Sequence, residues 1–450
     1  MSLGLRENPL IAVLLVTIVV SYFVIGTLYA VLTPIWQVPD EPAHYNYVRW
    51  VAEGNGLPVL EPGDYDQEYL ERLTSEGFPA DLPIEPLRYE DHQPPLFYLL
   101  AAPIYSLVDG AVLPLRMLSV VLGAGLLIAA FGTTRTVFPR QPHLALMVTA
   151  FIAFVPQHVA MTAGVNNDAL AGLTVGGALW ALAGYVRRTS ERPGSGAAQE
   201  PRPWHLGILL GAALLTKATA YVVVGVALAA VVLRAHRDRR PWSWMVRQTA
   251  WMLAPALLLS GPWFIRNALT YGWLDPMGLA RHHAVVAGQP RSYQWLAAYG
   301  WAGLIDRMVR TTFQSFWAQF GWMAVPLPAR FYAALAIFSV LLLAGFLVWF
   351  LRRPRCYVPG PLIHHPVSLL ALSASLTFLA FCWYNLTFVQ HQGRYLHPAL
   401  IPLGTVVALG LDVWVRLLPA RYRAWALTVF FAGMSGFVLY CLFAIVVPNL

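Results

Sequence analysis

Charged residues are scarce in this sequence. Asp, Glu, Lys and Arg make up 12% of the 450 residues, whereas soluble globular chains have about 25%. Apolar residues reach 58%, and the mean hydropathy is +0.57. This composition excludes an ordinary soluble domain and a disordered chain. Apolar runs of nearly 20 residues recur along the sequence, and they predict an all-α polytopic membrane protein.

Cysteine and lysine are rare as well. The three cysteines (Cys356, Cys382 and Cys441) lie in or beside apolar runs, which argues against a disulfide framework. A single lysine accompanies 29 arginines, and the net charge is +8. We attribute this charge to basic loops on the cytoplasmic side of a membrane, and we expect no nucleic-acid partner.

Eleven apolar segments are predicted to cross the membrane, near residues 9–33, 116–134, 143–163, 168–186, 204–216, 218–233, 249–265, 331–351, 367–385, 397–415 and 425–447. Segment 94–108 is treated differently, because its 15 residues open with two prolines and fall short of the ~20 that a span needs. We expect a re-entrant or juxtamembrane helix there. With this assignment the arginine clusters share the cytoplasmic face, the N-terminus is inside and the C-terminus is outside.

The predicted organisation is a single transmembrane domain over residues 1–450 with two long external loops. Residues 34–115 form the first loop, with its juxtamembrane helices, and residues 266–330 form the second. Asp40, Asp168 and Arg394 are then external, whereas Arg135 and Arg188 are internal. Segment 190–203 is expected to be an inward-facing linker, and the first apolar run is expected to be an uncleaved span.

Acidic residues at the outer ends of spans are the first candidates for chemistry. Asp40 and Glu41 follow the first span, and His44 lies one helical turn further on. Asp168 follows two asparagines before the fourth span. Capping of a helix N-terminus is the alternative role for Asp40 and Asp168. Capping does not account for Asp40, Glu41 and His44 occurring together.

Three cations also lie at outer span ends. Lys217 is the only lysine, Arg266 ends the seventh span, and Arg394 precedes the tenth. Lysine binds phosphate as a point charge, and arginine offers a fork of donors that matches phosphate oxygens. A lysine at an interface also snorkels to lipid headgroups, so both roles stay open for Lys217.

Other patterns carry less weight. His282-His283 and His364-His365 lack nearby ligand partners and are expected to be ordinary loop histidines. The aromatic stretch 295–322 suits an interfacial belt, with a sugar-stacking wall as the alternative. The sequence contains no P-loop, GxGxxG, HExxH, CxxC pair or GxSxG.

Six dispersed motifs together resemble the GT-C superfamily of polyprenyl-phosphate-dependent glycosyltransferases, which includes protein O-mannosyltransferases and aminoarabinose transferases. The likeness is to bacterial members with a PDEPAH motif and a terminal QGRY motif. The matching segments are PDEPAHY at 39–45, HQPPLFYLL at 92–100, NNDAL at 166–170, LLTKAT at 214–219, PWFIRN at 262–267 and QGRYLHP at 392–398.

The resemblance implies an inverting glycosyltransferase that moves a hexosyl or pentosyl group from a polyprenyl-phosphate donor to an acceptor. The acceptor is a cell-envelope glycan, a lipid or a protein, and the reaction takes place at the outer face of a bacterial cytoplasmic membrane. Asp40 or Glu41 is implied as the base, with Asp40 preferred, and His44 and Asp168 complete the catalytic set. Lys217, Arg266 and Arg394 are implied to hold the donor phosphate. The residues expected in the substrate cleft are His92, Gln93, Asn167, His391, Gln392 and Tyr395.

We expect no cofactor. A divalent metal held by Asp40, His44 and Asp168 is an alternative that the residue types allow, but no spacing in the sequence demands it.

Two other functions compete with glycosyl transfer. A transporter or flippase for a lipid-linked or small anionic substrate would carry ionisable groups near mid-span and show repeat symmetry. This sequence places its ionisable groups at outer span ends and shows no internal repeat. An acyl- or phosphotransferase acting on the same lipid carriers is consistent with the same residue types.

Overall fold

A computed structural model describes residues 9–187, 203–352 and 365–450. Its elements in chain order are α1 (Pro9–Leu32), α2 (Glu41–Ala52), α3 (Gln67–Ser75), α4 (Leu96–Leu107), α5 (Val112–Val137), α6 (Pro142–Ala153), α7 (Pro156–Thr162), α8 (Asp168–Arg187), α9 (Trp204–Leu214), η2 (Ala218–Tyr221), α10 (Val222–Arg237), α11 (Trp242–Tyr271), α12 (Leu279–Val285), α13 (Ser292–Trp317), β1 (Gln319–Phe320), β2 (Val325–Pro326), α14 (Ala329–Arg352), α15 (Val367–Asn385), η4 (Gly393–Ala399), α16 (Leu400–Leu417), α17 (Ala420–Tyr440), η5 (Cys441–Val446) and α18 (Val447–Asn449). Arg188, His364, Cys356 and nearly all of the linker 190–203 lie outside the described residues.

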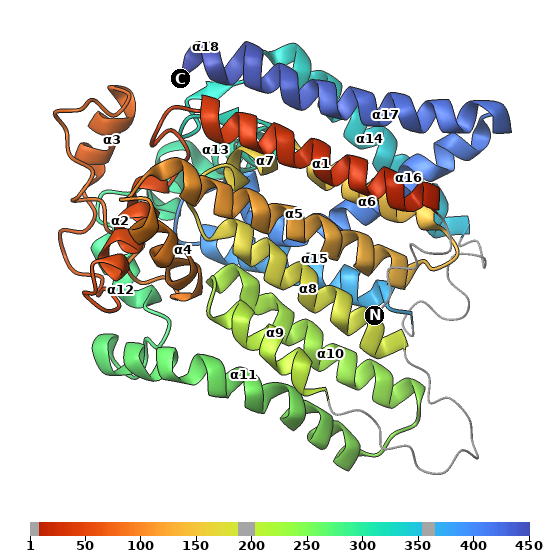
Figure 1. Ribbon diagram of the computed structural model, residues 1–450, viewed down its shortest axis with the longest axis horizontal. Helices are drawn as coiled ribbons and strands as arrows, with labels where there is room; N and C mark the ends of the chain where they lie inside the picture. The colour runs from red at the N-terminus through yellow and green to blue at the C-terminus, as the bar shows by residue number, and fades with distance from the viewer. Residues whose placement is uncertain (1–8, 188–202, 353–364) are drawn as a thin grey trace.

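The fold is a bundle of long apolar helices (Figure 1). Within the described residues, eight helical segments are long and apolar enough to cross a membrane, and α6 and α7 form a ninth that bends by 65°. The bend falls where Pro156 opens α7, since proline lacks the N–H that would continue the helix from α6. The predicted all-α polytopic fold is confirmed.

The remaining two predicted spans correspond to α9 and α11. Helix α9 has 11 residues, ends before Leu215 and is followed by the turn that leads to η2, where the sequence predicted a break. Helix α11 has 30 residues and extends past both ends of the predicted 249–265 span. Figure 1 shows both helices running alongside α10. Helix α4 has only 12 residues and lies at one end of the bundle with α2, as the juxtamembrane prediction requires.

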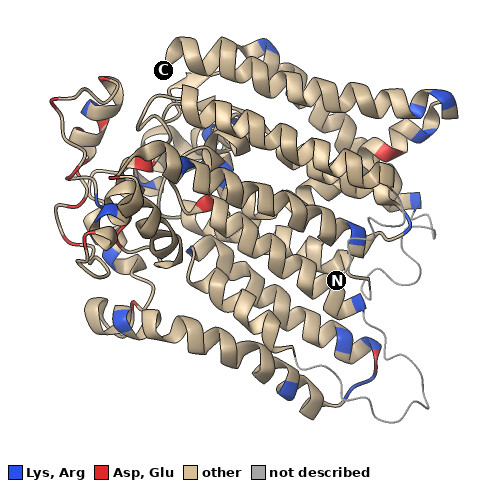
Figure 2. Ribbon diagram, viewed as in Figure 1, with Lys and Arg blue, Asp and Glu red and all other residues tan. Residues whose placement is uncertain are grey.

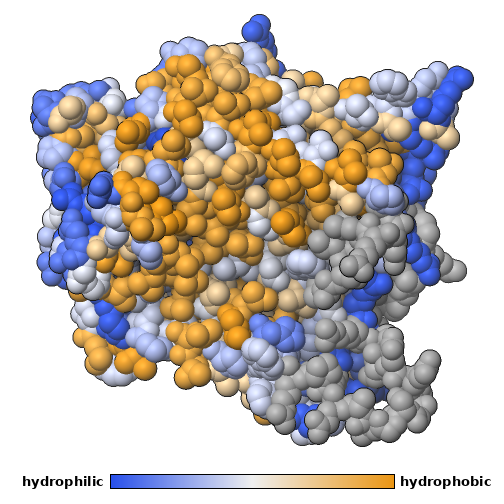
Figure 3. Space-filling model, viewed as in Figure 1, coloured by the Kyte–Doolittle hydropathy of each residue, from blue (hydrophilic) through white to orange (hydrophobic). Residues whose placement is uncertain are grey.

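The two ends of the bundle differ in charge. Most of the acidic residues lie at the end that carries α2 and α3 (Figure 2). Helices α5 and α8 end together at the opposite end, where Arg187 Nη1 donates to the Thr136 carbonyl over 3.2 Å. Figure 3 shows an apolar band over the visible face between two hydrophilic ends. The α2–α4 end is hereafter called the loop end, and it also holds α12, α13 and the C-terminal residue.

Close helix packing sets the positions of the loops at this end. Helix α5 packs against α1, α6 and α8. A Cβ atom at Gly123 would lie 1.9 Å from the hydroxyl oxygen of Tyr22, so only glycine admits that ring between α1 and α5. The Tyr22 hydroxyl in turn donates to Thr162 over 2.8 Å, and this bond fixes α7 against the start of the bundle.

The aromatic stretch 295–322 divides between two environments. It forms most of α13 and the turn between β1 and β2, and α13 kinks at Gly300, where φ is 66°. Tyr299 and Trp301 are 60% and 67% exposed, which suits an interfacial belt. Trp322 faces inward and donates to the Trp36 carbonyl over 2.9 Å.

Candidate active site

Asp40 lies in the turn between α1 and α2. Its φ of 66° is left-handed, and its side chain makes no hydrogen bond to the start of α2. Oδ1 instead accepts from the Tyr89 hydroxyl over 2.9 Å, and Oδ2 pairs with the guanidinium of Arg394. Burial alone would raise the pKa of Asp40, but the charges of Arg394 and His44 outweigh it and lower this pKa. Asp40 is therefore an ionised carboxylate and not a helix cap.

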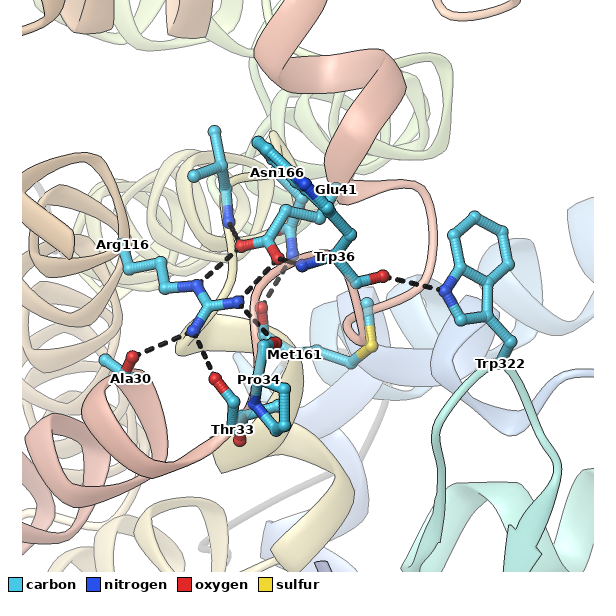
Figure 4. A network of polar contacts seen from close by, with 10 residues as sticks. Ala30, Thr33, Pro34, Trp36, Glu41, Arg116, Met161, Asn166 and Trp322 are labelled. Atoms are coloured by element: carbon cyan, nitrogen blue, oxygen red, sulfur yellow. Dashed lines mark hydrogen bonds and ion pairs between the residues drawn. The ribbon is translucent and has the colours of Figure 1, made fainter. Parts of the chain in front are cut away.

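Glu41 has a different environment, although it is the next residue. Its side chain is fully buried, and its two oxygens accept from Arg116 Nε and Nη2, each over 2.7 Å. The backbone amides of Trp36 and Val165 donate to the same carboxylate over 3.0 Å each (Figure 4). Every strong acceptor site on Glu41 is thus occupied by the protein.

Arg116 completes this structural network. It is 2% exposed and also donates to the carbonyls of Ala30, Thr33 and Pro34 over 2.7–3.0 Å. The network joins the end of α1 to the start of α2 and to α5 (Figure 4). Arg116 was not among the predicted site residues, because it opens an apolar span 75 residues away from Glu41. Of the two acids proposed as the base, Glu41 belongs to this scaffold.

Lys217 and Asp168 form an ion pair. Lys217 Nζ lies 2.5 Å from Asp168 Oδ1, and the two side chains are 12% and 24% exposed. Asn167 holds the two loops together, since its Nδ2 donates to the Thr216 carbonyl over 3.2 Å. The structure therefore brings together two residues that the sequence placed in separate groups. Lys217 keeps two further N–H donors for a ligand.

Arg394 is positioned by the glycine before it. A Cβ atom at Gly393 would lie 2.3 Å from the backbone nitrogen of Phe316 and 2.4 Å from the carbonyl oxygen of Thr312. Only glycine therefore lets η4 pack this closely on α13. Arg394 is buried, its Nε donates to Gln392 Oε1 over 2.6 Å, and its Nη2 meets Asp40. Among the described residues nothing accepts from Nη1, which is free for a ligand.

Glu90 is an acid of this site that was not predicted. Its Oε2 is buried and has no hydrogen-bond partner among the described residues. Burial is the main cause of its raised pKa, and the Asp40 carboxylate adds to the effect, against the opposing charges of His44 and Lys217. Glu90 lies two residues before the HQPPLFYLL motif at 92–100. Its position next to that motif was the only signal for it in the sequence.

Two histidines lie at the edge of the acidic cluster. His44 Nδ1 is 2.8 Å from the Tyr98 hydroxyl, and burial is the main cause of its lowered pKa. His92 Nδ1 is 3.1 Å from the Tyr89 carbonyl, and burial lowers its pKa to about 4. The ring of His92 lies 4.6 Å from that of His282. His282, expected to be an ordinary loop residue, thus belongs to the site.

Two cavities meet at this cluster. The first, hereafter the polar cavity, measures about 490 Å³, and its lining includes His391 and Gln392. The second, hereafter the membrane cavity, measures about 190 Å³, and its lining includes His92, Gln93 and Lys217. The residues that line both are Asp40, Glu90, His282, Tyr384, Arg394 and Tyr395.

The membrane cavity extends along α15. Thr377, Phe381 and Trp383 line it, and Trp383 is 60% exposed on the apolar surface of the bundle. This cavity therefore combines a cationic end with an apolar wall next to the lipid-facing surface.

The remaining predicted site residues have other placements. Arg266 lines neither cavity: its Nη2 donates to the carbonyls of Leu57 and Pro58, and its Nη1 donates to Asn267. These bonds anchor the loop after α2 to α11. Asn167, His44 and Asp168 line neither cavity.

The carboxylates are paired with cations and are not gathered around a metal position. Among the described residues, no group of three or more His, Cys, Asp or Glu side chains is placed to hold a metal ion. Asp40 pairs with Arg394, Asp168 pairs with Lys217, and His44 Nδ1 faces Tyr98. In this arrangement the three side chains do not converge on one point where they could hold a metal ion.

Comparisons with known proteins agree with this architecture. Residues 92–265 match the family model of dolichyl-phosphate-mannose-protein mannosyltransferase. No curated protein matches the chain significantly in sequence.

Three solved structures are similar to the chain. The archaeal oligosaccharyltransferase AglB from Archaeoglobus fulgidus, in complex with an inhibitory peptide and a dolichol-phosphate, matches with a TM-score of 0.50 at 13% identity, over 99% of this chain and 55% of that one. The Archaeoglobus fulgidus oligosaccharyltransferase with Zn and sulfate gives 0.48 at 15% identity, over 94% and 52%. ArnT from Cupriavidus metallidurans, bound to undecaprenyl phosphate, gives 0.49 at 15% identity, over 98% and 74%.

The chain spans about half the length of the archaeal oligosaccharyltransferases that it matches. The first of these likenesses establishes the fold, and the family match covers the segment from the juxtamembrane motif to α11. The predicted resemblance is confirmed: the chain is a polytopic membrane protein with the GT-C fold, and its residues 92–265 match the mannosyltransferase family.

Proposed function

We propose that this protein is an inverting glycosyltransferase that moves a sugar from a polyprenyl-phosphate donor to a hydroxyl acceptor. The single observation that carries the proposal is the meeting of a cationic, membrane-facing cavity and a polar cavity at one ionised carboxylate, Asp40. The matched mannosyltransferase family and the dolichol-phosphate bound to AglB support a lipid-linked donor.

The donor phosphate is proposed to bind in the membrane cavity, where Lys217 and Arg394 supply cations with free N–H groups. The polyprenyl chain lies along the apolar wall formed by α15. As the bond from the sugar C1 to the phosphate oxygen breaks, negative charge grows on the phosphate. The two cations stabilise that charge because they are already oriented by Asp168 and Asp40.

The acceptor is proposed to approach from the polar cavity. Its hydroxyl oxygen attacks the sugar C1 on the face opposite the phosphate, and its proton passes to Asp40. Asp40 suits this role better than Glu41, because the Glu41 carboxylate is already saturated by Arg116 and two amides. The base must lie where the two cavities meet, and Asp40 does.

We propose that the loop end faces outward from the cytoplasmic membrane. The opposite end carries Arg135, Arg187 and the arginines between α10 and α11, as expected for a cytoplasmic face. The sugar and the acceptor are not fixed by these features.

The test of the function is transfer from a polyprenyl-phosphate sugar, with donor binding measured in parallel. Asp40→Asn keeps the size of the side chain and should bind donor, but it should lose transfer by about 10²–10⁴-fold, the usual range for a general base. Transfer by Asp40→Asn at the wild-type rate would remove Asp40 from the mechanism.

The phosphate site has its own test. Lys217→Ala and Arg394→Ala should each weaken donor binding by about 1.5–3 kcal/mol, the usual worth of a charged hydrogen bond. Arg330→Ala is a matched control, because Arg330 is exposed at the start of α14 and lines neither cavity. Unchanged donor affinity in both site variants would contradict the phosphate assignment.

A further inference from the structure

The polar cavity contains an unusual concentration of unpaired polar atoms. Five residues that line it each carry a buried side-chain atom without a hydrogen-bond partner among the described residues: Glu90 Oε2, Gln289 Oε1, Arg307 Nε, Gln319 Oε1 and His391 Nδ1. These residues come from the first long loop, from the segment after α12, from α13, from β1 and from the segment before η4. Elements distant in sequence therefore contribute polar residues with unpaired atoms to the wall of one cavity.

Such atoms are costly unless something pairs with them. A buried polar atom without a partner destabilises a folded protein, so most are satisfied by protein, water or ligand. A cluster on one cavity wall therefore indicates a site built for a ligand that forms several hydrogen bonds. The cavity volume of about 490 Å³ is within the usual range for small-molecule sites.

The chemical types of these atoms narrow the ligand class. The amide oxygens of Gln289 and Gln319 only accept, and the Glu90 carboxyl accepts when it is ionised and also donates when it is protonated. Arg307 Nε only donates, and His391 Nδ1 does either. The ligand must therefore bring both donors and acceptors. Hydroxyl groups provide both from the same atom.

The walls of the cavity add a second, independent constraint. Five of its lining residues are aromatic: Tyr65, Tyr89, Trp322, Tyr384 and Tyr395. Their rings offer flat apolar surfaces between the polar atoms, and Tyr and Trp suit ligands that are apolar on one side and polar on the other. A pyranose or furanose ring has that character, with C–H groups on its faces and hydroxyls at its edge.

Among other acceptor classes, a lipid fits less well. A lipid acceptor needs an apolar path from the membrane, and the lipid-facing wall belongs to the other cavity. A peptide brings donors and acceptors, as hydroxyl groups do, so the binding test below includes one as the competing class.

Given the proposed function, we infer that the polar cavity is the acceptor site and that the acceptor is a carbohydrate. Glu90 lines both cavities, as Asp40 does, and faces the reacting hydroxyl. His391, Gln289, Arg307 and Gln319 line the polar cavity alone and bind the hydroxyls of the acceptor further from the reacting atoms.

The inference can be tested by binding, without transfer. The full chain in lipid nanodiscs is titrated with neutral disaccharides (maltose, lactose, mannobiose and diacetylchitobiose), with a serine-containing peptide as the competing class, and binding is followed by saturation-transfer NMR. At least one disaccharide should bind the wild-type chain. Arg307→Gln and Gln319→Ala should each weaken that binding by about tenfold or more, as expected for one lost hydrogen bond to a buried group.

The matched control is Arg310→Gln, three residues from Arg307 on α13. Arg310 is 66% exposed and pairs with Asp306, so disaccharide binding should not change. Polyprenyl-phosphate binding, measured on the same samples, should be unchanged in all three variants, which shows that they are folded.

Three results would overturn the inference: no disaccharide binding by the wild-type chain, binding of the peptide alone, or disaccharide affinity unchanged in Arg307→Gln and Gln319→Ala. Absence of polyprenyl-phosphate binding in the wild-type chain is a separate result. It would contradict the proposed function, whereas the disaccharide measurement tests only the ligand class of the polar cavity.

Discussion

At the level of single residues, the adjacent acids Asp40 and Glu41 have different surroundings. The carboxylates of Asp40 and Glu41 point in different directions from the turn after α1 and therefore have different partners. The left-handed backbone of Asp40 presents its carboxylate to the cavities, whereas Glu41 faces Arg116 and two backbone amides. The buried pair of Glu41 and Arg116 supports the turn, and in the proposed function Asp40 supplies the reactive group.

A substitution at Glu41 should therefore affect stability and not chemistry. Glu41→Gln leaves Arg116 buried without a counter-charge, which should destabilise the protein by on the order of 3 kcal/mol. Thermal unfolding of the purified protein should show a lower midpoint, while transfer per folded molecule persists. Glu85→Gln is the matched control, since Glu85 is 57% exposed in its pair with Arg49 and such pairs contribute about 0–1 kcal/mol. An unchanged midpoint with lost transfer would instead identify Glu41 as the base.

The pairing of Arg394 with Asp40 predicts a pH effect on the rate. The guanidinium lowers the pKa of Asp40 against the effect of burial. Arg394→Gln removes that charge, so the pKa of Asp40 should rise by about 1–3 units. Transfer needs the ionised carboxylate and is lost as the pH falls through its pKa. The acidic limb of kcat at saturating donor should consequently move to higher pH.

Arg394→Lys separates charge from geometry in the same experiment. It keeps the positive charge and changes the hydrogen bonds, so its acidic limb should stay near that of the wild-type protein even if donor binding weakens. Equal displacement of the limb in both variants would show that the charge of Arg394 does not control Asp40.

The positions of the candidate site residues were only partly predictable from the sequence. Asp40, Asp168, Lys217 and Arg394 were singled out because charged residues at span ends are rare in an apolar chain. The sequence could not separate Asp40 from Glu41, since the partner that distinguishes them lies 75 residues away. Glu90 was missed because loop acids are common and its neighbours in space are far away in the chain.

At the scale of elements, η4 and α13 act as one unit. Gly393 lets the two backbones touch, and its N–H donates to Ser315 Oγ over 2.7 Å. The position of Arg394 follows from that contact. Helix α13 itself was not predicted, because its aromatic residues indicated an interfacial belt or a sugar-stacking wall and gave no sign of a helix next to the site.

Gly393→Ala should accordingly disturb catalysis through the backbone. The added Cβ must push η4 away from α13 and displace Arg394 from Asp40. A displacement of about 1 Å costs on the order of 10²-fold in rate, so kcat should fall by a similar factor. Gly436→Ala in α17 is the control, because a Cβ there meets nothing within 4 Å and alanine favours a helix. Wild-type kcat in Gly393→Ala would show that the close approach is not needed.

At the scale of the whole molecule, the helical bundle was predictable and the cavities were not. Long apolar segments with arginine at one end specify spans, and the short segment 94–108, predicted to be a re-entrant or juxtamembrane helix, forms a helix of only 12 residues at the loop end. Cavities depend on how loops from distant parts of the chain pack together, and no local pattern in a single sequence records this. The 65° bend between α6 and α7 was not predicted either, since segment 143–163 was expected to form one uninterrupted span.

The topology itself gives a prediction. In a chain whose native cysteines are replaced, Asp81→Cys at the loop end should react with a membrane-impermeant thiol reagent in intact cells. Arg140→Cys, after α5 at the opposite end, should react only after the membrane is opened. Both positions are exposed, so access to the side chain is matched. Labelling of position 140 from outside would reverse the proposed orientation.

In the proposed function, the phosphate of a lipid-linked donor binds in the membrane cavity, and its sugar lies where the two cavities meet. An experimental structure of the full chain with a bound polyprenyl phosphate tests this placement. We expect density for the headgroup between Lys217 and Arg394, within hydrogen-bonding distance of both, and for the polyprenyl chain along α15. A headgroup bound at the arginine-rich end of the bundle, or at Arg266 with Lys217 and Arg394 still holding only their acidic partners, would contradict it.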